Sequence, residues 1–146
     1  MTYNQSPWSL SDLFPAQDSP EMKSAFDELD TKVVEFEALR PSLTPSISAE
    51  AFMSAIQLFE AIARLANRIG SFAGLSFSAD TQDQAALAFQ SEVETRMAVI
   101  TNRTLFFSLW WKSLEDAQAT RLMDERLQMQ GTQWMRRIRD WARQQR

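Results

Sequence analysis

The chain has 146 residues, of which 45% are apolar and 23% are charged. These proportions are typical of a folded globular domain and exclude disordered and fibrous classes. No histidine and no cysteine occurs, which excludes imidazole and thiol catalysts, a disulfide framework and any zinc site built on those ligands.

Charge is distributed unevenly along the chain. The formal net charge is −4, but residues 1–100 contain 14 acids and 6 bases, whereas residues 101–146 contain 5 acids and 9 bases. An acidic body argues against nucleic acid as a partner, because phosphate binding needs a basic face. We interpret the basic terminal segment as a solvated helix face and expect no binding to nucleic acid or membranes.

No membrane span or secretory signal is predicted. The chain has no run of about eighteen apolar residues, and its first residues contain neither a basic region nor an apolar core. These features favour a cytoplasmic location.

Residues 1–18 are predicted to form an extended N-terminal arm that docks on the rest of the chain. Two prolines bracket a short apolar stretch and favour extended backbone before them. The apolar side chains of this stretch need a surface to lie against. They are Trp8, Leu10, Leu13 and Phe14.

The chain contains only three glycines and five prolines, which is too little turn sequence for a many-stranded fold and favours long helices. The first helix is predicted to begin at Ser19, an N-cap, with Pro20 at its first position, and to end before Pro41 and Pro45. One apolar stripe of the helix should face the core. The stripe is Met22, Phe26, Leu29, Val33 and Phe36.

A second helix is predicted to begin after Ser48, where Ile47 and Phe52 occupy the two positions of a hydrophobic staple. Further along, small residues at every fourth position form a ridge that favours close approach of another helix; a hinge or a surface for another domain is the alternative. A short strand over Phe72–Phe77 is a competing prediction, less favoured because its apolar residues do not alternate cleanly. The ridge is Ala66, Gly70, Gly74 and Ser78.

A third, long helix is predicted to open with a capping box over Thr81–Gln84. Large apolar residues between Leu105 and Trp111 should bury its far end on several sides, either in the core or against residues that this chain lacks. The aromatic stripes are interpreted as core, with a ligand groove as the alternative. The stripe of this helix is Ala86, Phe89, Val93, Met97, Ile100, Thr104, Phe107 and Trp111.

A fourth helix is predicted to begin at Ser113, with acids in its first turn, and to end at Gly131. Thr132 then starts a last helix. The predicted fold is an all-α helical bundle of about five helices with long antiparallel pairs, in which residues 19–146 form a single helical lobe.

No catalytic, cofactor-binding or metal-ligating residue is assigned. The sequence has no glycine-rich phosphate loop, nucleophile elbow or calcium loop. Close carboxylate pairs occur: Glu35 with Glu37, Asp80 with Asp83, Glu92 with Glu94, and Glu115 with Asp116. Side chains one or two residues apart diverge on a helix, so the first and third pairs do not share a face.

Four segments follow one another along the chain: Trp8–Pro15, Arg68–Leu75, Ala79–Thr81 and Leu105–Phe107. Together they resemble the N-terminal region of oligoendopeptidase F, which belongs to the thimet-oligopeptidase-like zinc metallopeptidases. The resemblance implies an all-helical lobe that helps to wall a deep channel for short peptides, while a separate downstream domain holds the zinc. It also implies oligopeptides as substrates of the parent enzyme and the catalytic domain as a partner.

The chain departs from the family in its catalytic residues. The family uses a His-Glu-x-x-His helix and a later glutamate, and a chain without histidine cannot supply those ligands. We therefore expect the chain alone to be inactive, either as a fragment or as a gene product that retains only the lobe. The alternative hypothesis is a free-standing interaction module that self-associates through apolar helix faces.

Overall fold

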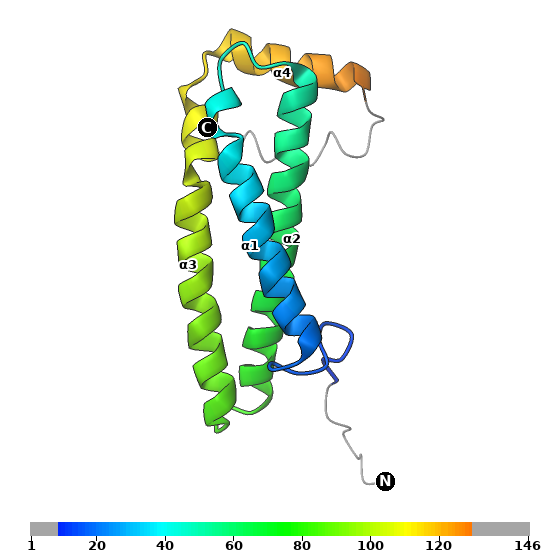
Figure 1. Cartoon of the computed structure of the whole chain (residues 1–146), viewed down its shortest axis with the longest axis vertical. Helices are drawn as coiled ribbons and strands as arrows, with labels where there is room; N and C mark the ends of the chain where they lie inside the picture. Colours follow the sequence, from blue (N-terminus) through cyan, green and yellow to red (C-terminus); the bar gives the residue numbers. More distant parts are fainter. Residues whose placement is uncertain (1–8, 130–146) are drawn as a thin grey trace, which may run out of the picture. The chain divides into compact units, whose positions relative to one another are not determined.

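The computed structural model describes residues 9–129 (Figure 1). These residues form four α-helices and one short 3-10 helix, with no strand among them, so the predicted all-α class is confirmed. The expected helix end at Gly131 and the last helix from Thr132 lie outside the described residues. The elements are α1 (Pro20–Ala38), η1 (Arg40–Ser42), α2 (Ala49–Ala79), α3 (Gln84–Ser113) and α4 (Asp116–Met129).

The chain divides into two compact units. Among the described residues, the first unit comprises 9–32 and 61–100, and the second comprises 33–60 and 101–129. Helices α1, α2 and α3 each supply residues to both units. Each unit therefore has its own buried apolar residues.

Helix α1 begins as predicted, because Ser19 caps it. The Oγ of Ser19 accepts a hydrogen bond from the backbone N–H of Met22 (3.2 Å) and donates one to the carbonyl of Ala16 (2.8 Å). This satisfies one of the backbone donors that a helix leaves unpaired at its start. The predicted stripe is buried at Met22, Leu29, Val33 and Phe36 and partly buried at Phe26.

Phe14 anchors the arm within the first unit. Its side chain is 1% exposed and meets the ring of Phe72 edge-on, with 5.7 Å between the centroids. The guanidinium of Arg68 lies 4.3 Å from the centroid of the Phe14 ring and donates a hydrogen bond to the carbonyl of Leu13. The backbone here turns rather than extends, since the carbonyl of Leu10 accepts from the N–H groups of Leu13 and Phe14.

Helix α2 also begins where the sequence predicts. The Oγ of Ser48 accepts a hydrogen bond from the N–H of Ala51 (3.1 Å). The staple residues Ile47 and Phe52 are both buried, which fixes the direction in which the chain enters the helix. The helix continues through Phe72–Phe77, so the competing prediction of a strand there is wrong.

The ridge of small residues on α2 does not approach another helix closely. Apart from its chain neighbours and the nearby backbone of α2, a β-carbon added at Gly70 or Gly74 would meet no described atom within 4 Å, so the prediction of close packing is wrong. The buried face lies one position away, at Ile69 and Ala73. Adjacent helical residues point about 100° apart, which turns the ridge away from the core.

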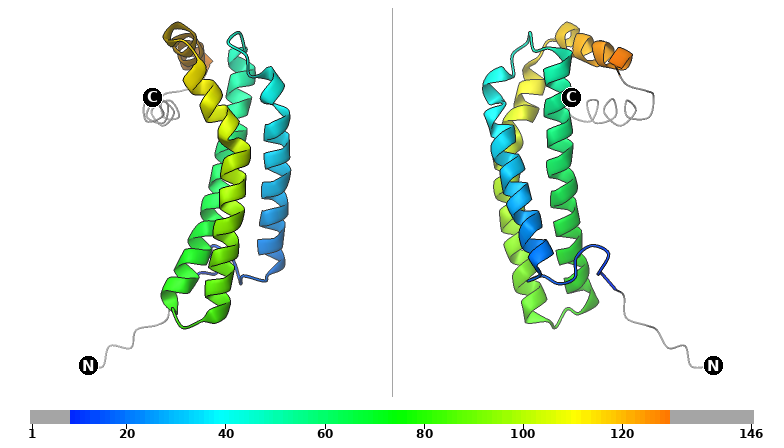
Figure 2. Two further views of the ribbon diagram at one scale, coloured as in Figure 1. Left: turned by 90° about the vertical axis from the view of Figure 1, so that its left-hand side faces the viewer. Right: turned by 45° about the vertical axis from the view of Figure 1, so that its right-hand side comes forward.

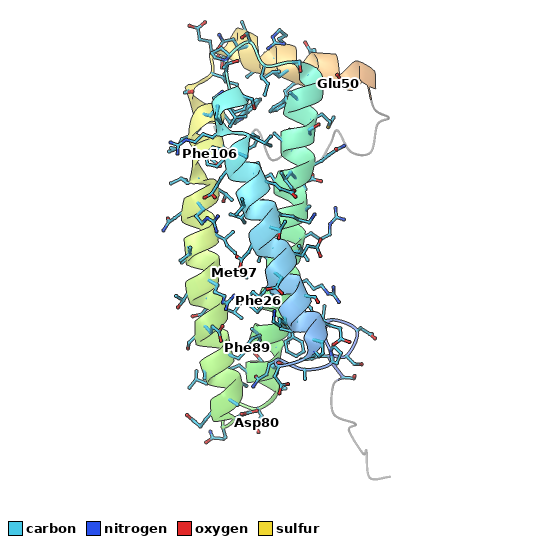
Figure 3. The ribbon with its side chains drawn as sticks, viewed as in Figure 1. Phe26, Glu50, Asp80, Phe89, Met97 and Phe106 are labelled. Carbon is cyan, nitrogen blue, oxygen red and sulfur yellow. The ribbon has the colours of Figure 1, made fainter. Side chains whose placement is uncertain are left out.

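In the first unit, α2 and α3 lie side by side and are joined by the turn over residues 80–83 (Figure 2); Asp80 marks this turn in Figure 3. The Oδ1 of Asp83 accepts hydrogen bonds from the N–H groups of Ala85 (2.9 Å) and Ala86 (3.2 Å). Asp83 is therefore the N-cap of α3, and the capping box predicted from Thr81 is wrong.

The apolar stripe of α3 is confirmed over the whole helix. Seven of its eight predicted positions are buried, and Met97 is partly buried. Positions up to Ile100 belong to the first unit, and positions from Thr104 onward belong to the second. One helix face thus contributes to both cores.

Helix α4 begins at Asp116, because α3 continues to Ser113. The predicted start at Ser113 is therefore wrong by three residues, while the predicted acidic residue in the first turn is confirmed at Asp116. Within the second unit, the Nη2 of Arg121 donates hydrogen bonds to the carbonyls of Pro45 (3.1 Å) and Ile47 (3.0 Å). These bonds tie α4 to the segment that precedes α2.

The open surroundings of Gly74 predict that Gly74→Ala stabilises the protein. Alanine restricts the unfolded chain and suits a helix better than glycine, which is worth about 1 kcal/mol at such a position. The free energy of unfolding, measured by urea denaturation, should rise by this amount. A lower free energy of unfolding for Gly74→Ala, or a large decrease for Gly74→Leu, would contradict the open surroundings of Gly74.

Candidate functional site

The C-terminal half of α3 presents different environments on its different sides. Phe107 and Trp111 are fully buried, whereas Leu105 is 47% and Leu109 is 58% exposed. The expectation that this end is buried in the core is therefore wrong for the two leucines, while the alternative, burial against residues that this chain lacks, stays a prediction. Side chains that follow one another on a helix spread around its axis, and the described helices of the second unit cover only part of that circumference.

An aromatic cluster fills the buried side within the second unit. The Phe36 ring lies 5.5 Å from Phe59, 5.2 Å from Phe106 and 5.4 Å from Phe107, centroid to centroid. Phe107 also lies 5.6 Å from Trp110. Pairs at this spacing contribute about 0.5–1.5 kcal/mol each beyond their buried area. The cluster holds the end of α1 against α3.

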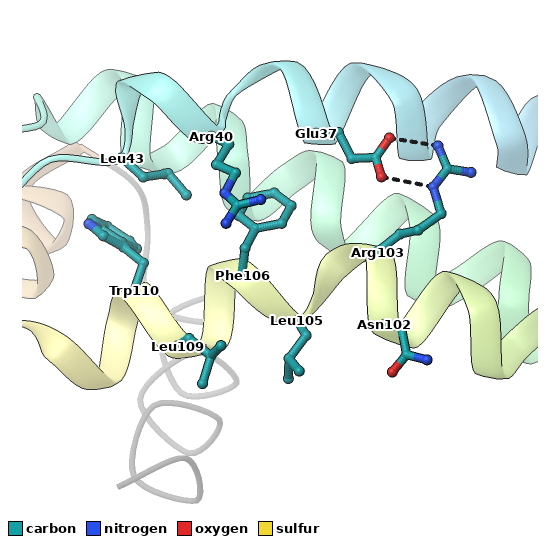
Figure 4. A pocket seen from close by; sticks show the side chains of 9 residues that line it. All are labelled: Glu37, Arg40, Leu43, Asn102, Arg103, Leu105, Phe106, Leu109 and Trp110. Atoms are coloured by element: carbon teal, nitrogen blue, oxygen red, sulfur yellow. Dashed lines mark hydrogen bonds and ion pairs between the residues drawn. The ribbon is translucent and has the colours of Figure 1, made fainter.

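A groove of about 520 Å³ lies beside this cluster, entirely within the second unit (Figure 4). This volume falls within the range of small-ligand sites, about 300–1,000 Å³. One wall comes from the end of α1 and the residues after it, and the other comes from α3. The lining residues are Glu37, Arg40, Leu43, Asn102, Arg103, Leu105, Phe106, Leu109 and Trp110.

Glu37 and Arg103 form a two-point ion pair in the groove. The Nε of Arg103 donates to Oε1 of Glu37 (2.8 Å), and the Nη2 donates to Oε2 (2.6 Å). The hydrogen bond from Arg103 lowers the pKa of Glu37 below its ordinary value; partial desolvation opposes this shift, and the charge of Arg103 adds to it. The Glu37 carboxylate is therefore ionised at pH 7, and the positive charge of Arg103 compensates its negative charge.

Arg40 supplies the remaining charge of the groove. Its guanidinium lies 5.5 Å from the centroid of the Phe106 ring, in cation–π geometry. The side chain is exposed and has no ion pair with a carboxylate among residues 9–129. Since Glu37 and Arg103 compensate each other, the groove carries one net positive charge on a lining of mixed polar and apolar side chains.

Several members of the close carboxylate pairs have partners within the described residues. Glu37 binds Arg103, Asp83 caps α3, and Glu92 forms an ion pair with Arg96 (3.2 Å). The amide of Gln90 donates to Glu94 (3.2 Å). Within residues 9–129, no group of three or more acidic side chains is placed to hold a metal ion.

The basic terminal segment that the sequence singles out lies largely outside the described residues, which include none of its arginines from Arg136 onward. No helix of residues 9–129 combines the length and apolarity needed to cross a membrane.

Sequence reasoning missed the groove residues Arg40 and Leu43 and the pairing of Glu37 with Arg103. The two members of the ion pair are 66 residues apart, and charge patterns within one helix do not report such a contact. The available signal was the surplus of large apolar residues between Leu105 and Trp111, which exceeds what one buried helix face can hold.

Comparison of the chain with protein-family models, with curated proteins and with solved structures finds no match in any of the three sets. Function is therefore inferred from the residues and their geometry.

The lowered pKa of Glu37 predicts a pH-dependent contribution of its ion pair to stability. Because the pKa is depressed in the folded state, the contribution is present above the ordinary carboxyl pKa and is lost as the pH falls through the folded value. For a pair this exposed to solvent, we expect Glu37→Gln to cost at most about 1 kcal/mol at pH 7.

Urea denaturation of the parent and of Glu37→Gln at several pH values checks this expectation. The stability difference should shrink as the pH falls below the ordinary carboxyl pKa. Glu35→Gln is the matched control, because Glu35 is exposed and has no ion pair with a described residue. If the difference in the free energy of unfolding between the parent and Glu37→Gln stayed constant down to pH 3, the ion-pair interpretation would be contradicted.

Proposed function

We propose that this chain is the N-terminal helical lobe of an oligoendopeptidase F-like zinc metalloendopeptidase. In this proposal, the lobe walls the channel through which short peptides reach the catalytic zinc and performs no chemistry itself. The observation that carries the proposal is the ordered set of four family-like segments. They are Trp8–Pro15, Arg68–Leu75, Ala79–Thr81 and Leu105–Phe107.

Contacts within the first unit support the proposal. Phe14, from the first segment, packs against Phe72, from the second. Arg68, also from the second segment, donates a hydrogen bond to the carbonyl of Leu13, 55 residues earlier. Two distant segments that carry the resemblance therefore meet, as expected if they build one common structure.

The proposal assigns the zinc to a domain outside this chain. The chain contains no histidine or cysteine, and its acidic residues within 9–129 form no metal-holding group. The residues therefore do not fit the zinc of the family, and no catalytic step is assigned to them. The catalytic domain is the proposed partner, oligopeptides are the substrates of the complete enzyme, and the cytoplasm is the proposed location.

The finer architecture belongs to the same proposal. We infer about five helices in long antiparallel pairs, with residues 19–146 as one lobe behind the arm. Such a lobe acts by shape and contact, since a channel wall excludes folded proteins by its dimensions.

The DNA downstream of the codon for Arg146 tests this proposal. We expect an open reading frame that encodes a His-Glu-x-x-His motif. We also expect the purified 146-residue chain, supplied with zinc, to leave oligopeptides intact. A gene without that motif would contradict the assignment to a complete enzyme of this family, and peptide turnover by the pure chain would contradict its non-catalytic role.

A second candidate function is a free-standing module that self-associates. It is favoured by Leu105 and Leu109, which lie one turn apart on α3 and are both exposed. In this case, two copies bury the leucines against each other.

Analytical ultracentrifugation at micromolar concentration separates the two candidates. The self-association hypothesis predicts a dimer that Leu109→Lys dissociates, whereas Val34→Lys, a matched exposed position on α1, leaves it intact. A monomer over the whole concentration range would exclude this second candidate.

A further inference from the structure

We propose that the groove between the end of α1 and α3 binds the C-terminal residue of an oligopeptide. Its α-carboxylate is held by Arg40, and its apolar side chain lies against Leu43, Leu109 and Trp110. The inference deepens the proposed function and rests on it, because it names the part of a peptide that this lobe contacts.

Charge selects a single carboxylate as the anionic part of the ligand. Arg103 is already engaged by both oxygens of Glu37, so Arg40 is the cation that the groove can offer. A guanidinium presents paired N–H donors that match the two oxygens of a carboxylate. One available cation does not suit a polyanion, since nucleic acids and anionic membranes require several basic side chains.

The guanidinium of Arg40 contacts the Phe106 ring. Their cation–π contact lies within the groove and modestly favours one placement of the donors of this exposed side chain. Restraining a long side chain in advance reduces the entropy that binding would otherwise cost. Arg40 is therefore better prepared for a carboxylate than a freely moving surface arginine.

The chemistry on the two sides of Arg40 matches a peptide end. Figure 4 shows Leu43 and Trp110 on one side of Arg40 and the Glu37–Arg103 pair on the other. The first side accepts an apolar side chain. The second side presents the carboxylate oxygens of Glu37, each of which accepts from Arg103 and has a further lone pair for a backbone N–H. A fatty acid has a carboxylate and an apolar body but no N–H group for that side.

The test measures binding of acetyl-Ala-Ala-Phe to the 146-residue chain by isothermal titration calorimetry. The free-acid peptide is compared with the same peptide carrying a C-terminal carboxamide. We expect the free acid to bind at least about tenfold more tightly, because only the carboxylate forms charge-assisted bonds with Arg40. Equal affinities of the acid and the amide would overturn the proposal.

Variants separate the carboxylate contact from the apolar contact. Arg40→Gln should abolish the preference for the free acid, while Arg64→Gln, at an exposed arginine on α2, should preserve it. Leu109→Ser should weaken the acid and the amide by the same factor, because both share the apolar side chain. Circular dichroism confirms that each variant is folded. A preference that survives Arg40→Gln, or that Arg64→Gln also abolishes, would overturn the proposal.

Two further outcomes distinguish a peptide ligand from a fatty acid, and a failure of this inference from a failure of the proposed function. Decanoate that binds as tightly as the free-acid peptide would overturn the peptide proposal in favour of a fatty acid. A gene that encodes His-Glu-x-x-His while the chain binds neither peptide would overturn this inference and leave the proposed function standing. Selective binding of the free acid supports the inference, even where the downstream frame contradicts the family assignment.

Discussion

The second unit depends on the packing of Phe107 against Phe36, Phe59 and Trp110. Phe107 and Phe36 are fully buried, so the end of α1 and the C-terminal half of α3 share one aromatic core. This core sets the spacing of the two groove walls, since Glu37 follows Phe36 directly and Phe106 precedes Phe107. The groove is therefore a consequence of how this core is packed.

Polar contacts then divide the groove into a neutral part and a charged part. The two-point pairing of Glu37 with Arg103 removes one positive and one negative charge from the groove. Arg40 keeps its charge and rests on Phe106. A partly solvent-exposed ion pair contributes little to stability, so its main effect here is to leave a single cation in a groove of mixed polar and apolar lining.

Helix stripes and serine caps could be predicted from the sequence, because they depend on residues close together in the chain. The stripe of α3 and the caps at Ser19 and Ser48 are examples. Local signals failed where two possible N-caps lay close together, and where tertiary packing determined which face of a helix is buried. Asp83 caps α3 instead of Thr81, and the face beside Gly70 and Gly74 is open because the core takes the neighbouring face. The groove escaped prediction because its charges and walls join residues more than sixty positions apart.

A peptide titration followed by NMR tests the central proposal, that this chain binds peptides by contact and performs no chemistry on them. The ¹⁵N-labelled chain would be titrated with free-acid acetyl-Ala-Ala-Phe in the presence of zinc. Our account predicts that the shifted signals cluster at Arg40, Leu43 and residues 105–110, including the Trp110 indole, and that the peptide spectrum stays that of the intact peptide. Shifts confined to the first unit, or the appearance of cleaved peptide, would contradict it.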